Sequence, residues 1–186
     1  FNVHVSGGDL TADMEKVKTE EEAKTIAAAC DKKQAVVSSV GRETKTVNPP
    51  KLYDLTTLQR EANRYYGFTA QQTLDLVQSL YEKKLLTYPR TDSRYLTDDM
   101  KPMLPSLISQ VAEKIGVDAS ALKSDDKPEI SVDVMCDSRK VSDHHAIIPT
   151  KTMCSANLTE LPSGEKAILQ LIAVRLLCAA APDYRY

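Results

Sequence analysis

A tyrosine and an arginine two residues apart have the chemistry to act together on a phosphate. Tyr88 and Arg90 lie within residues 85–96, with Pro89 between them. A phenol titrates near pKa ~10, so it attacks phosphorus only where a nearby cation or metal stabilises its ionised form. Pro89 fixes its own φ and favours an extended conformation at Tyr88. In an extended backbone residues i and i+2 project to the same side, so the phenol and the guanidinium can meet one phosphate.

Polar side chains around this pair suit a phosphodiester backbone. The candidates for contact with DNA are Lys84, Thr91, Ser93 and Arg94. From the residues alone another interpretation stays open, in which a strand ends in an Asp/Ser turn, Tyr88 is half buried and Arg90 lies in solvent.

Two separated motifs resemble the active site of a known family. The run Leu-Thr-Tyr-Pro-Arg-Thr-Asp-Ser-Arg-Tyr-Leu at residues 86–96 resembles the signature of type IA DNA topoisomerases, most of all the bacterial topoisomerase III branch. The run Ser-Asp-His-His-Ala-Ile-Ile-Pro-Thr at residues 142–150 resembles the His-containing motif of the same family. Residues 58–63 and 72–75 are also similar, so the resemblance covers most of the chain from residue 49 to residue 182.

The resemblance implies a role for each site residue. Tyr88 matches a nucleophile that attacks one DNA strand and stays on its 5′ phosphate, which conserves the bond energy for rejoining without ATP. Arg90 matches the arginine that stabilises charge on the phosphoryl oxygens. His144 matches the motif histidine, expected to donate a hydrogen bond to a phosphate near the cut. His145 is the neighbouring candidate for a DNA contact, since the choice between the two histidines depends on motif register.

The resemblance also implies Mg²⁺, yet the Asp-x-Asp cluster and catalytic Glu of the family's metal-binding module have no counterpart in this sequence. Asp98-Asp99 and Asp125-Asp126 are adjacent pairs, whose side chains point to different sides of a strand or helix. We therefore expect no metal ligand in this chain. Both ends fall inside alternating patterns, at residues 1–5 and 184–186, which indicates a piece of a larger protein. That piece should be inactive without the missing core of the same polypeptide.

Composition sets broad limits. A hydrophobic content of 42% can supply a core, and a net charge of -2 leaves DNA binding to local clusters of charge. The four cysteines are scattered without a zinc pattern, which predicts reduced thiols. No apolar run approaches the ~20 residues of a membrane span. We expect a cytoplasmic, nucleoid-associated monomer whose partner is DNA, single-stranded at the cleavage site.

Residues 1–52 predict a small unit with strands, which the resemblance implies is the N-terminal part of an arch, or hinge, domain. Asn48-Pro49-Pro50 breaks the pattern and marks the best internal boundary. The expected elements are a strand over 1–5, a helix from a Thr19 and Glu22 capping box to 30–33, and strands over 35–37 and 43–47.

Residues 53–181 predict a mostly helical domain, which the resemblance implies is the active-site tyrosine domain. Two capped helices, separated at Gly67 and followed by the extended residues 85–88, resemble a helix-turn-helix with a wing, although a packed helical hairpin explains the pattern as well. The expected elements are helices capped at Thr56 with Gln59 and at Thr69 with Gln72, a helix over 107–115, a strand over 129–135, and a helix from Ser163 or Gly164 to Ala181.

The expected fold class is therefore α+β and mostly helical, with a winged-helix-like tyrosine domain attached to a small β-containing part of an arch. Residues 182–186 should begin the return into that arch. Two other functions stay open. A tyrosine recombinase attaches to the 3′ side and has basic residues ahead of a tyrosine near its C-terminus, whereas Arg90 follows a mid-chain Tyr88. A noncatalytic winged-helix DNA-binding module would form no covalent attachment at all.

Overall fold

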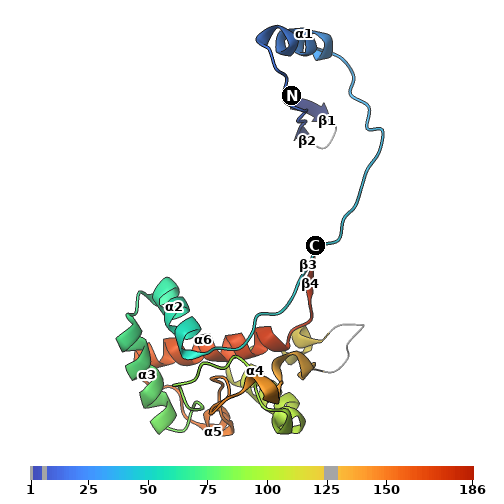
Figure 1. Cartoon of the computed structure of the whole chain (residues 1–186). Coiled ribbons are helices and arrows are strands. Elements are labelled where there is room, and N and C mark those ends of the chain that lie inside the picture. Colours follow the sequence, from blue (N-terminus) through green and yellow to red (C-terminus); the bar gives the residue numbers. More distant parts are fainter. Residues whose placement is uncertain (1, 6–7, 124–129) are drawn as a thin grey trace. The chain divides into compact units, whose positions relative to one another are not determined.

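The computed structural model describes residues 2–5, 8–123 and 130–186 (Figure 1). Contacts along the chain divide it into two compact units, residues 1–43 and residues 44–186. The predicted site residues all belong to the second unit. This boundary precedes the predicted one at residue 52, because Leu52 is fully buried in the core of the second unit. The arch assignment stays a prediction.

The first unit contains a two-stranded sheet and one helix. Strand β1 (Asn2–Val5) pairs antiparallel with β2 (Gly8–Thr11). Helix α1 (Glu20–Cys30) begins where predicted, because the Thr19 hydroxyl accepts a hydrogen bond from the Glu22 amide. The strand predicted over 35–37 is wrong, since Val36 and Val37 are strongly exposed and have no strand beside them among the described residues.

The second unit is mostly helical, so the chain is α+β with small sheets. Its helices are α2 (Leu55–Tyr66), α3 (Ala70–Glu82), α4 (Leu104–Lys114), α5 (Lys151–Ser155) and α6 (Ser163–Ala180). Short 3₁₀ turns, η1 to η4, occupy Asp98–Met103, Ala119–Leu122, Asp133–Met135 and Ser138–Lys140. Strand β3 (Thr46–Val47) pairs antiparallel with β4 (Tyr184–Arg185), which is all that forms of the strand predicted over 43–47.

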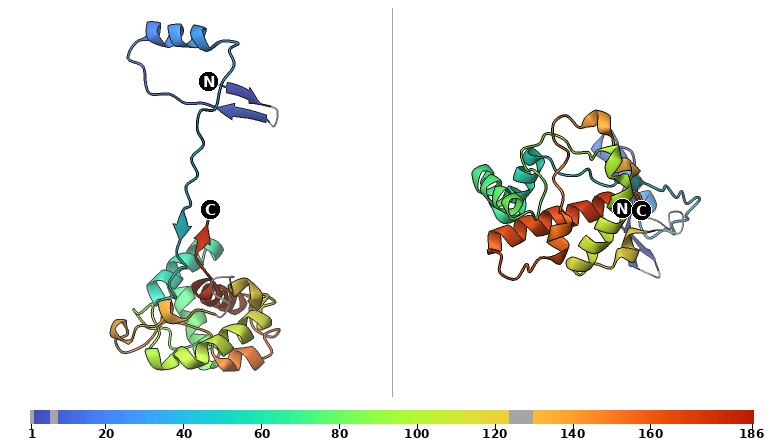
Figure 2. Two further views of the ribbon diagram at one scale, coloured as in Figure 1. Left: turned by 90° about the vertical axis from the view of Figure 1, so that its right-hand side faces the viewer. Right: turned by 90° about the horizontal axis from the view of Figure 1, so that it is seen from below.

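Helix α6 is the element around which the second unit is arranged. The left view of Figure 2 looks nearly along its axis and shows the other segments of this unit around it. It is apolar on almost every side, and Ile172, Ala173 and Leu176 are fully buried. The predicted helix is confirmed, and it ends because Ala181 is extended ahead of Pro182. No helix in the described ranges is long and apolar enough to cross a membrane.

The caps of α2 and α3 show how local sequence sets helix starts. The capping box of α3 is confirmed, since Thr69 and Gln72 exchange hydrogen bonds between side chain and backbone amide. The box predicted at Thr56 is wrong. Asp54 caps α2 by accepting from the Thr57 amide at 2.6 Å, and the Gln59 side chain donates to the Ala70 carbonyl. The Asp54 carboxylate, two residues before Thr56, accepts the hydrogen bond from the free amide at the start of the helix.

The strand predicted over 129–135 is also wrong, although its first residue lies outside the described residues. Residues Asp133–Met135 form a 3₁₀ turn, and the adjoining contact is a single bridge between Leu96 and Cys136. The Leu96 amide donates to the Met135 carbonyl and the Leu96 carbonyl accepts from the Asp137 amide. The alternation does not mark one buried face, since Val134 within the turn is 62% exposed.

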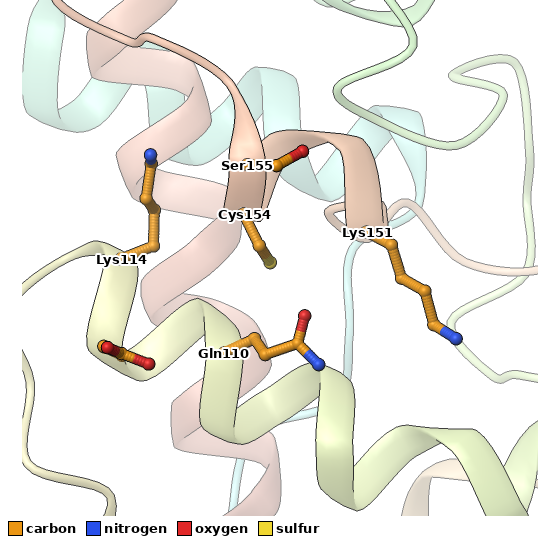
Figure 3. Close-up of a pocket in the computed structure, with 6 residues that line it drawn as sticks. Gln110, Lys114, Lys151, Cys154 and Ser155 are labelled. Carbon is orange, nitrogen blue, oxygen red and sulfur yellow. The ribbon is translucent and has the colours of Figure 1, made fainter.

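A cavity of about 460 Å³ opens between α4 and α5 (Figure 3). Gln110 and Lys114 of α4 and Cys154 of α5 line it, and the Lys114 ammonium donates to the Ala156 carbonyl at 2.7 Å. Burial raises the pKa of the Cys154 thiol. None of the predicted site residues lines this cavity.

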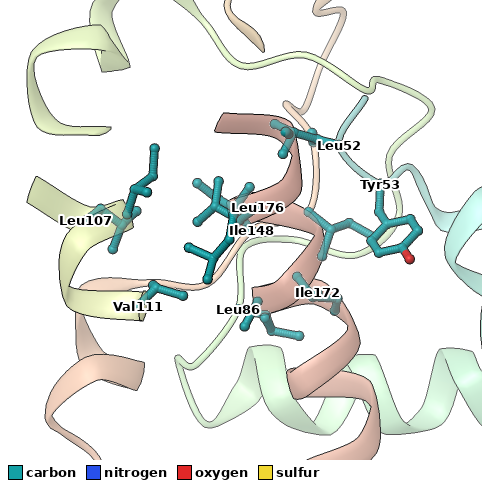
Figure 4. Close-up of a cluster of buried hydrophobic side chains, with 14 of the residues drawn as sticks. Leu52, Tyr53, Leu86, Leu107, Val111, Ile148, Ile172 and Leu176 are labelled. Atoms are coloured by element: carbon teal, nitrogen blue, oxygen red, sulfur yellow. The ribbon is translucent and has the colours of Figure 1, made fainter. Parts of the chain in front are cut away.

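The core joins both sequence motifs to the helices (Figure 4). Leu86 from the first motif and Ile148 from the second are each 1% exposed, and both lie in one cluster with α4 and α6. The members labelled in Figure 4 are Leu52, Tyr53, Leu86, Leu107, Val111, Ile148, Ile172 and Leu176. Burying a leucine or isoleucine side chain contributes ~1.5–3 kcal/mol, so the apolar residues of each motif anchor it to the core.

Candidate active site

The two motifs lie side by side and antiparallel. The Thr87 amide donates to the Ile148 carbonyl at 3.0 Å, and the Thr150 amide donates to the Leu85 carbonyl at 3.0 Å. Leu86 bridges Pro149 between these bonds, and the Thr87 hydroxyl accepts from the Ile148 amide at 2.9 Å. Pro149 has no amide to donate, so the pairing is a short bridge rather than a strand ladder. Segments more than fifty residues apart in the chain thus share one register.

A third segment, residues 52–55, holds both motifs. The Ile147 amide donates to the Tyr53 carbonyl at 2.9 Å, and the Leu55 amide donates to the Thr91 carbonyl at 3.1 Å. Arg94 Nε donates to the Leu52 carbonyl at 3.1 Å. One guanidinium nitrogen of Arg94 thus holds this segment, and its contact with DNA stays a prediction.

Tyr88 lies between two rings. Its ring centroid is 4.3 Å from that of His144, with a tilt of 47°. On another side Tyr81, from the last turn of α3, meets it edge to face at 5.4 Å and 78°. Tyr88 is half buried and His144 is exposed, so the predicted nucleophile and the predicted motif histidine are brought together at the surface.

Tyr81 is a member of the site that sequence reasoning missed. Its spacing with Leu74, Val77 and Leu80 predicts a core-facing stripe on α3. In the structure Val77 and Leu80 are fully buried, whereas Tyr81 is 37% exposed. An aromatic residue in the last turn of a helix, just before a chemical motif, is the signal that could have marked it.

Arg90 is exposed and makes no hydrogen bond or ion pair within the part of the chain that the structure describes. Its five N–H donors are therefore available to a phosphate. Lys84 is also exposed and has a left-handed backbone, with φ 61°. The Thr150 hydroxyl donates to the Lys84 carbonyl, which fixes this unusual turn at the entry to the first motif.

Thr91 and Ser93 are 8% and 5% exposed, and their hydroxyls find partners inside the protein. The Thr91 hydroxyl donates to the His144 carbonyl at 2.7 Å, and the Ser93 hydroxyl donates to the Lys140 carbonyl at 2.9 Å. Both were expected to contact DNA. A buried hydroxyl must be hydrogen-bonded. Thr91 therefore links the first motif to the second, Ser93 links it to the residues just before the second, and the DNA contacts stay a prediction.

His145, next to His144, makes a hydrogen bond to the backbone instead of a ring contact. Its Nδ1 is 2.8 Å from the Ala146 carbonyl, and a carbonyl only accepts, so Nδ1 carries the proton of this hydrogen bond. Of the two motif histidines, His144 is the one in contact with Tyr88.

A largely buried polar cluster includes Tyr53, whose carbonyl binds the second motif. Arg175 of α6 pairs with Glu61 of α2, and Tyr53 donates to the same carboxylate. The Arg175 guanidinium also lies over the Tyr53 ring at 4.3 Å and donates to the Lys51 carbonyl at 3.2 Å. Burial, followed by the Glu61 hydrogen bond, raises the pKa of Tyr53. Burial opposes ionisation of Glu61, but hydrogen bonds from Arg175 and Tyr53 outweigh it and lower the Glu61 pKa.

No three His, Cys, Asp or Glu side chains come together as metal ligands within residues 2–5, 8–123 and 130–186. Asp98 is taken up by Lys101 at 2.9 Å and by the Ser138 amide at 3.1 Å, and Asp125-Asp126 lie outside the described residues.

Comparisons with known proteins show the family to which the chain belongs. The family model described as DNA topoisomerase matches residues 3–186. Over 164 residues the chain is 40% identical to DNA topoisomerase 3 of Bacillus cereus (strain ATCC 14579), covering 87% of this chain and 22% of the relative. The corresponding protein of Bacillus subtilis (strain 168) is 42% identical over 156 residues, covering 83% of this chain and 21% of the relative.

A solved structure is also similar. Full-length topoisomerase I from Thermotoga maritima superposes with a TM-score of 0.58 at 25% identity, covering 95% of this chain and 28% of that one. The chain therefore belongs to the DNA topoisomerase family. Within that class, the chain belongs to the bacterial type IA family, on its topoisomerase III branch. It spans about a fifth of the length of the curated relatives it matches.

Proposed function

We propose that this chain supplies the nucleophile of a type IA topoisomerase that cuts and rejoins one DNA strand to change DNA topology. The observation that carries the proposal is the contact between the Tyr88 and His144 rings, with the Arg90 guanidinium two residues further on, which has no ion-pair partner among the described residues. This grouping offers a nucleophile, a donor and a fixed cation to a single phosphodiester.

In the proposed reaction the Tyr88 oxygen attacks phosphorus, and the bond from phosphorus to the 3′ oxygen breaks. The phenol loses its proton, the leaving 3′ oxygen takes up a proton, and the 5′ phosphate remains on Tyr88. Arg90 stabilises the charge that builds on the phosphoryl oxygens, and His144 donates a hydrogen bond to a neighbouring phosphate. Attack by the free 3′ hydroxyl reverses each bond change, so rejoining needs no external energy source.

The rest of the site has a supporting role in this proposal. Thr91 and Ser93 hold the two motifs together through the carbonyls of His144 and Lys140, and Lys84 adds a cation at the surface. Helices α2 and α3 with the extended residues 85–88 supply the winged-helix-like arrangement. Mg²⁺, when bound by residues outside this chain, would neutralise phosphate charge. Without the core of the polypeptide that holds those residues, the chain alone is inactive. The protein works as a cytoplasmic, nucleoid-associated monomer on single-stranded DNA.

The test is covalent trapping of end-labelled single-stranded DNA by the full-length parent protein with Mg²⁺. We expect a 5′-phosphotyrosyl adduct in the wild type and none in Tyr88→Phe. Arg90→Ala should slow adduct formation ~10²–10³-fold, the usual cost of removing one donor from a developing oxyanion. Tyr65→Phe, at an exposed position of α2, is the matched control and should react normally.

Each other outcome would point to a different function. A label retained through the 3′ phosphate indicates recombinase chemistry. DNA binding with no adduct in the full-length protein indicates a noncatalytic winged-helix module. An adduct that survives Tyr88→Phe reduces Tyr88 to a structural residue.

A further inference from the structure

A second cluster of cations surrounds Tyr95, at the far end of the first motif. The Lys140 ammonium lies 4.5 Å from the centroid of the Tyr95 ring, and the Lys51 ammonium lies 5.0 Å from it. We call Lys51, Tyr95 and Lys140 the Tyr95 patch. Lys51 precedes α2, Tyr95 closes the first motif, and Lys140 precedes the second, so three separate segments converge here.

Hydrogen bonds to backbone carbonyls hold the three segments of the patch in place. Ser93 donates to the Lys140 carbonyl at 2.9 Å, and Arg94 donates to the Leu52 carbonyl at 3.1 Å. The Tyr95 carbonyl accepts from the Ala146 amide at 2.9 Å. Each of the three segments is thus held next to the residues that hold Tyr88 and His144.

Positive charge exceeds negative charge at the patch. Asp137 binds both Arg139, at 3.0 Å, and Lys140, at 2.9 Å, and these two cations lower the Asp137 pKa. Lys51 makes no ion pair with any residue the structure describes. Lys51 first and Lys140 second also lower the pKa of the Tyr95 phenol. The whole chain carries a net charge of -2, so this excess is a local arrangement.

An aromatic ring set among lysines suits a ligand that combines phosphate charge with flat apolar faces. Cations that follow the backbone, with aromatic rings on which bases stack, are the means by which proteins hold single strands without reading sequence. An acidic protein surface would pair with the lysines but would offer the Tyr95 ring no flat base on which to stack.

The patch is also close to the cleavage residues along the chain. Tyr95 follows Tyr88 by seven residues, which span at most ~25 Å when fully extended. A strand held at Tyr88 therefore reaches the patch within a few nucleotides. Two segments connect the Tyr88–His144 contact to the Tyr95 patch: residues 90–94 and residues 140–144.

Resting on the proposed function, we propose that the Tyr95 patch is a second contact site for the cleaved single strand. Lys51 and Lys140 bind backbone phosphates a few nucleotides from the scissile one, and the Tyr95 ring stacks on a base. The patch anchors the strand, and the reaction itself stays with Tyr88.

The experiment measures equilibrium binding of labelled oligothymidylate by the full-length parent protein in a Tyr88→Phe background, where no covalent product forms. Affinity is measured across a range of salt concentrations for the patch variant Lys51→Gln/Lys140→Gln. The matched control is Lys123→Gln/Lys166→Gln, which removes two exposed lysines elsewhere. Thermal midpoints of all variants are recorded in parallel.

We expect the slope of log K against log salt to become shallower by ~0.7 for each patch lysine and to stay unchanged in the control. Tyr95→Ala should weaken binding roughly ten-fold or more at every salt concentration, without a change of slope, because stacking is lost and no phosphate contact is. Tyr95→Phe keeps the ring and should bind within two-fold of the parent, on the order of experimental scatter.

An unchanged slope in the patch variant overturns the proposal, whether or not the wild type forms its adduct. A lower thermal midpoint with an unchanged slope would mean that the lysines bind the rest of the polypeptide. If the slope falls as expected while the enzyme with Tyr88 intact forms no adduct, the patch stands and the proposed cleavage function fails.

Discussion

The Thr91 hydroxyl donates a hydrogen bond to the backbone carbonyl of His144, at 2.7 Å. This bond joins the residue after Arg90 to the histidine whose ring contacts Tyr88, so a buried hydroxyl helps to set the positions of the catalytic groups. Tyr88, Arg90 and Thr91 belong to one motif and His144 to another, more than fifty residues further along the chain.

Thr91→Val should therefore slow adduct formation while the protein stays folded. One neutral hydrogen bond contributes ~0.5–1.5 kcal/mol, which corresponds to a rate loss of roughly 2–10-fold if His144 is displaced. The measurement is the single-turnover rate of adduct formation by the full-length protein at saturating DNA. Thr91→Ser keeps the donor and should restore most of the rate. Equal losses in both variants would count against a role for the hydroxyl.

Tyr81→Ala should slow the same step, because the edge-to-face contact holds the Tyr88 ring in place. Such aromatic pairs contribute ~0.5–1.5 kcal/mol beyond burial, so we expect a loss of roughly 2–10-fold in rate. Tyr81→Phe keeps the edge and should behave as the parent does. Tyr65→Ala removes an exposed tyrosine of α2 that contacts neither Tyr88 nor His144, and its rate serves as the control.

Arg175→Met should destabilise the second unit, because Glu61 loses the cation that compensates its partial burial. Removing one partner of a buried pair costs ~3–5 kcal/mol, and since the Glu61 side chain is 25% exposed we expect about 2–3 kcal/mol. Denaturant unfolding of the purified full-length protein measures this. Arg175→Met/Glu61→Gln, which also removes the charge left behind, should recover part of the loss. A double variant no more stable than Arg175→Met would contradict this account.

The same pair predicts a pH dependence. The folded pKa of Glu61 is lowered from its usual 4.5, so the stability it contributes is fully present above that value and is lost as pH falls through the folded pKa. Glu61→Gln should accordingly flatten the acid side of the stability profile. The check is the free energy of unfolding of both proteins, measured from neutral pH downward. Parallel acid limbs in the two profiles would contradict the prediction.

The four free cysteines should differ in reactivity. Burial raises the pKa of Cys136 to about 11 and leaves it 6% exposed, whereas Cys30 and Cys178 are exposed. The thiolate is the reactive form, so iodoacetamide at neutral pH should modify the two exposed cysteines first and Cys136 last. Mass spectrometry of peptides at successive times measures the order. In denaturant all four should react at similar rates, and early labelling of native Cys136 would show that it is not buried.

Local signals predicted most of the elements correctly. The capping box of α3, the Gly67 stop of α2, the start of α1 and the length of α6 all follow from contacts within a few residues. The errors fall where a local pattern had competing outcomes. Asp54 outcompeted Thr56 as a cap, and the alternating residues before Cys136 turned instead of pairing with a neighbouring strand.

The sequence by itself determined the chemistry at hand: a Tyr and an Arg two residues apart, a paired histidine motif, and two motifs that resemble one family. Tertiary structure decided which of these groups meet. It brought His144 into contact with Tyr88, added Tyr81, buried Thr91 and Ser93, and bound Arg94 to a neighbouring segment. The physical reason is that a buried hydroxyl must find a partner wherever the packed chain supplies one, and that partner can lie fifty residues away, beyond the reach of any local pattern.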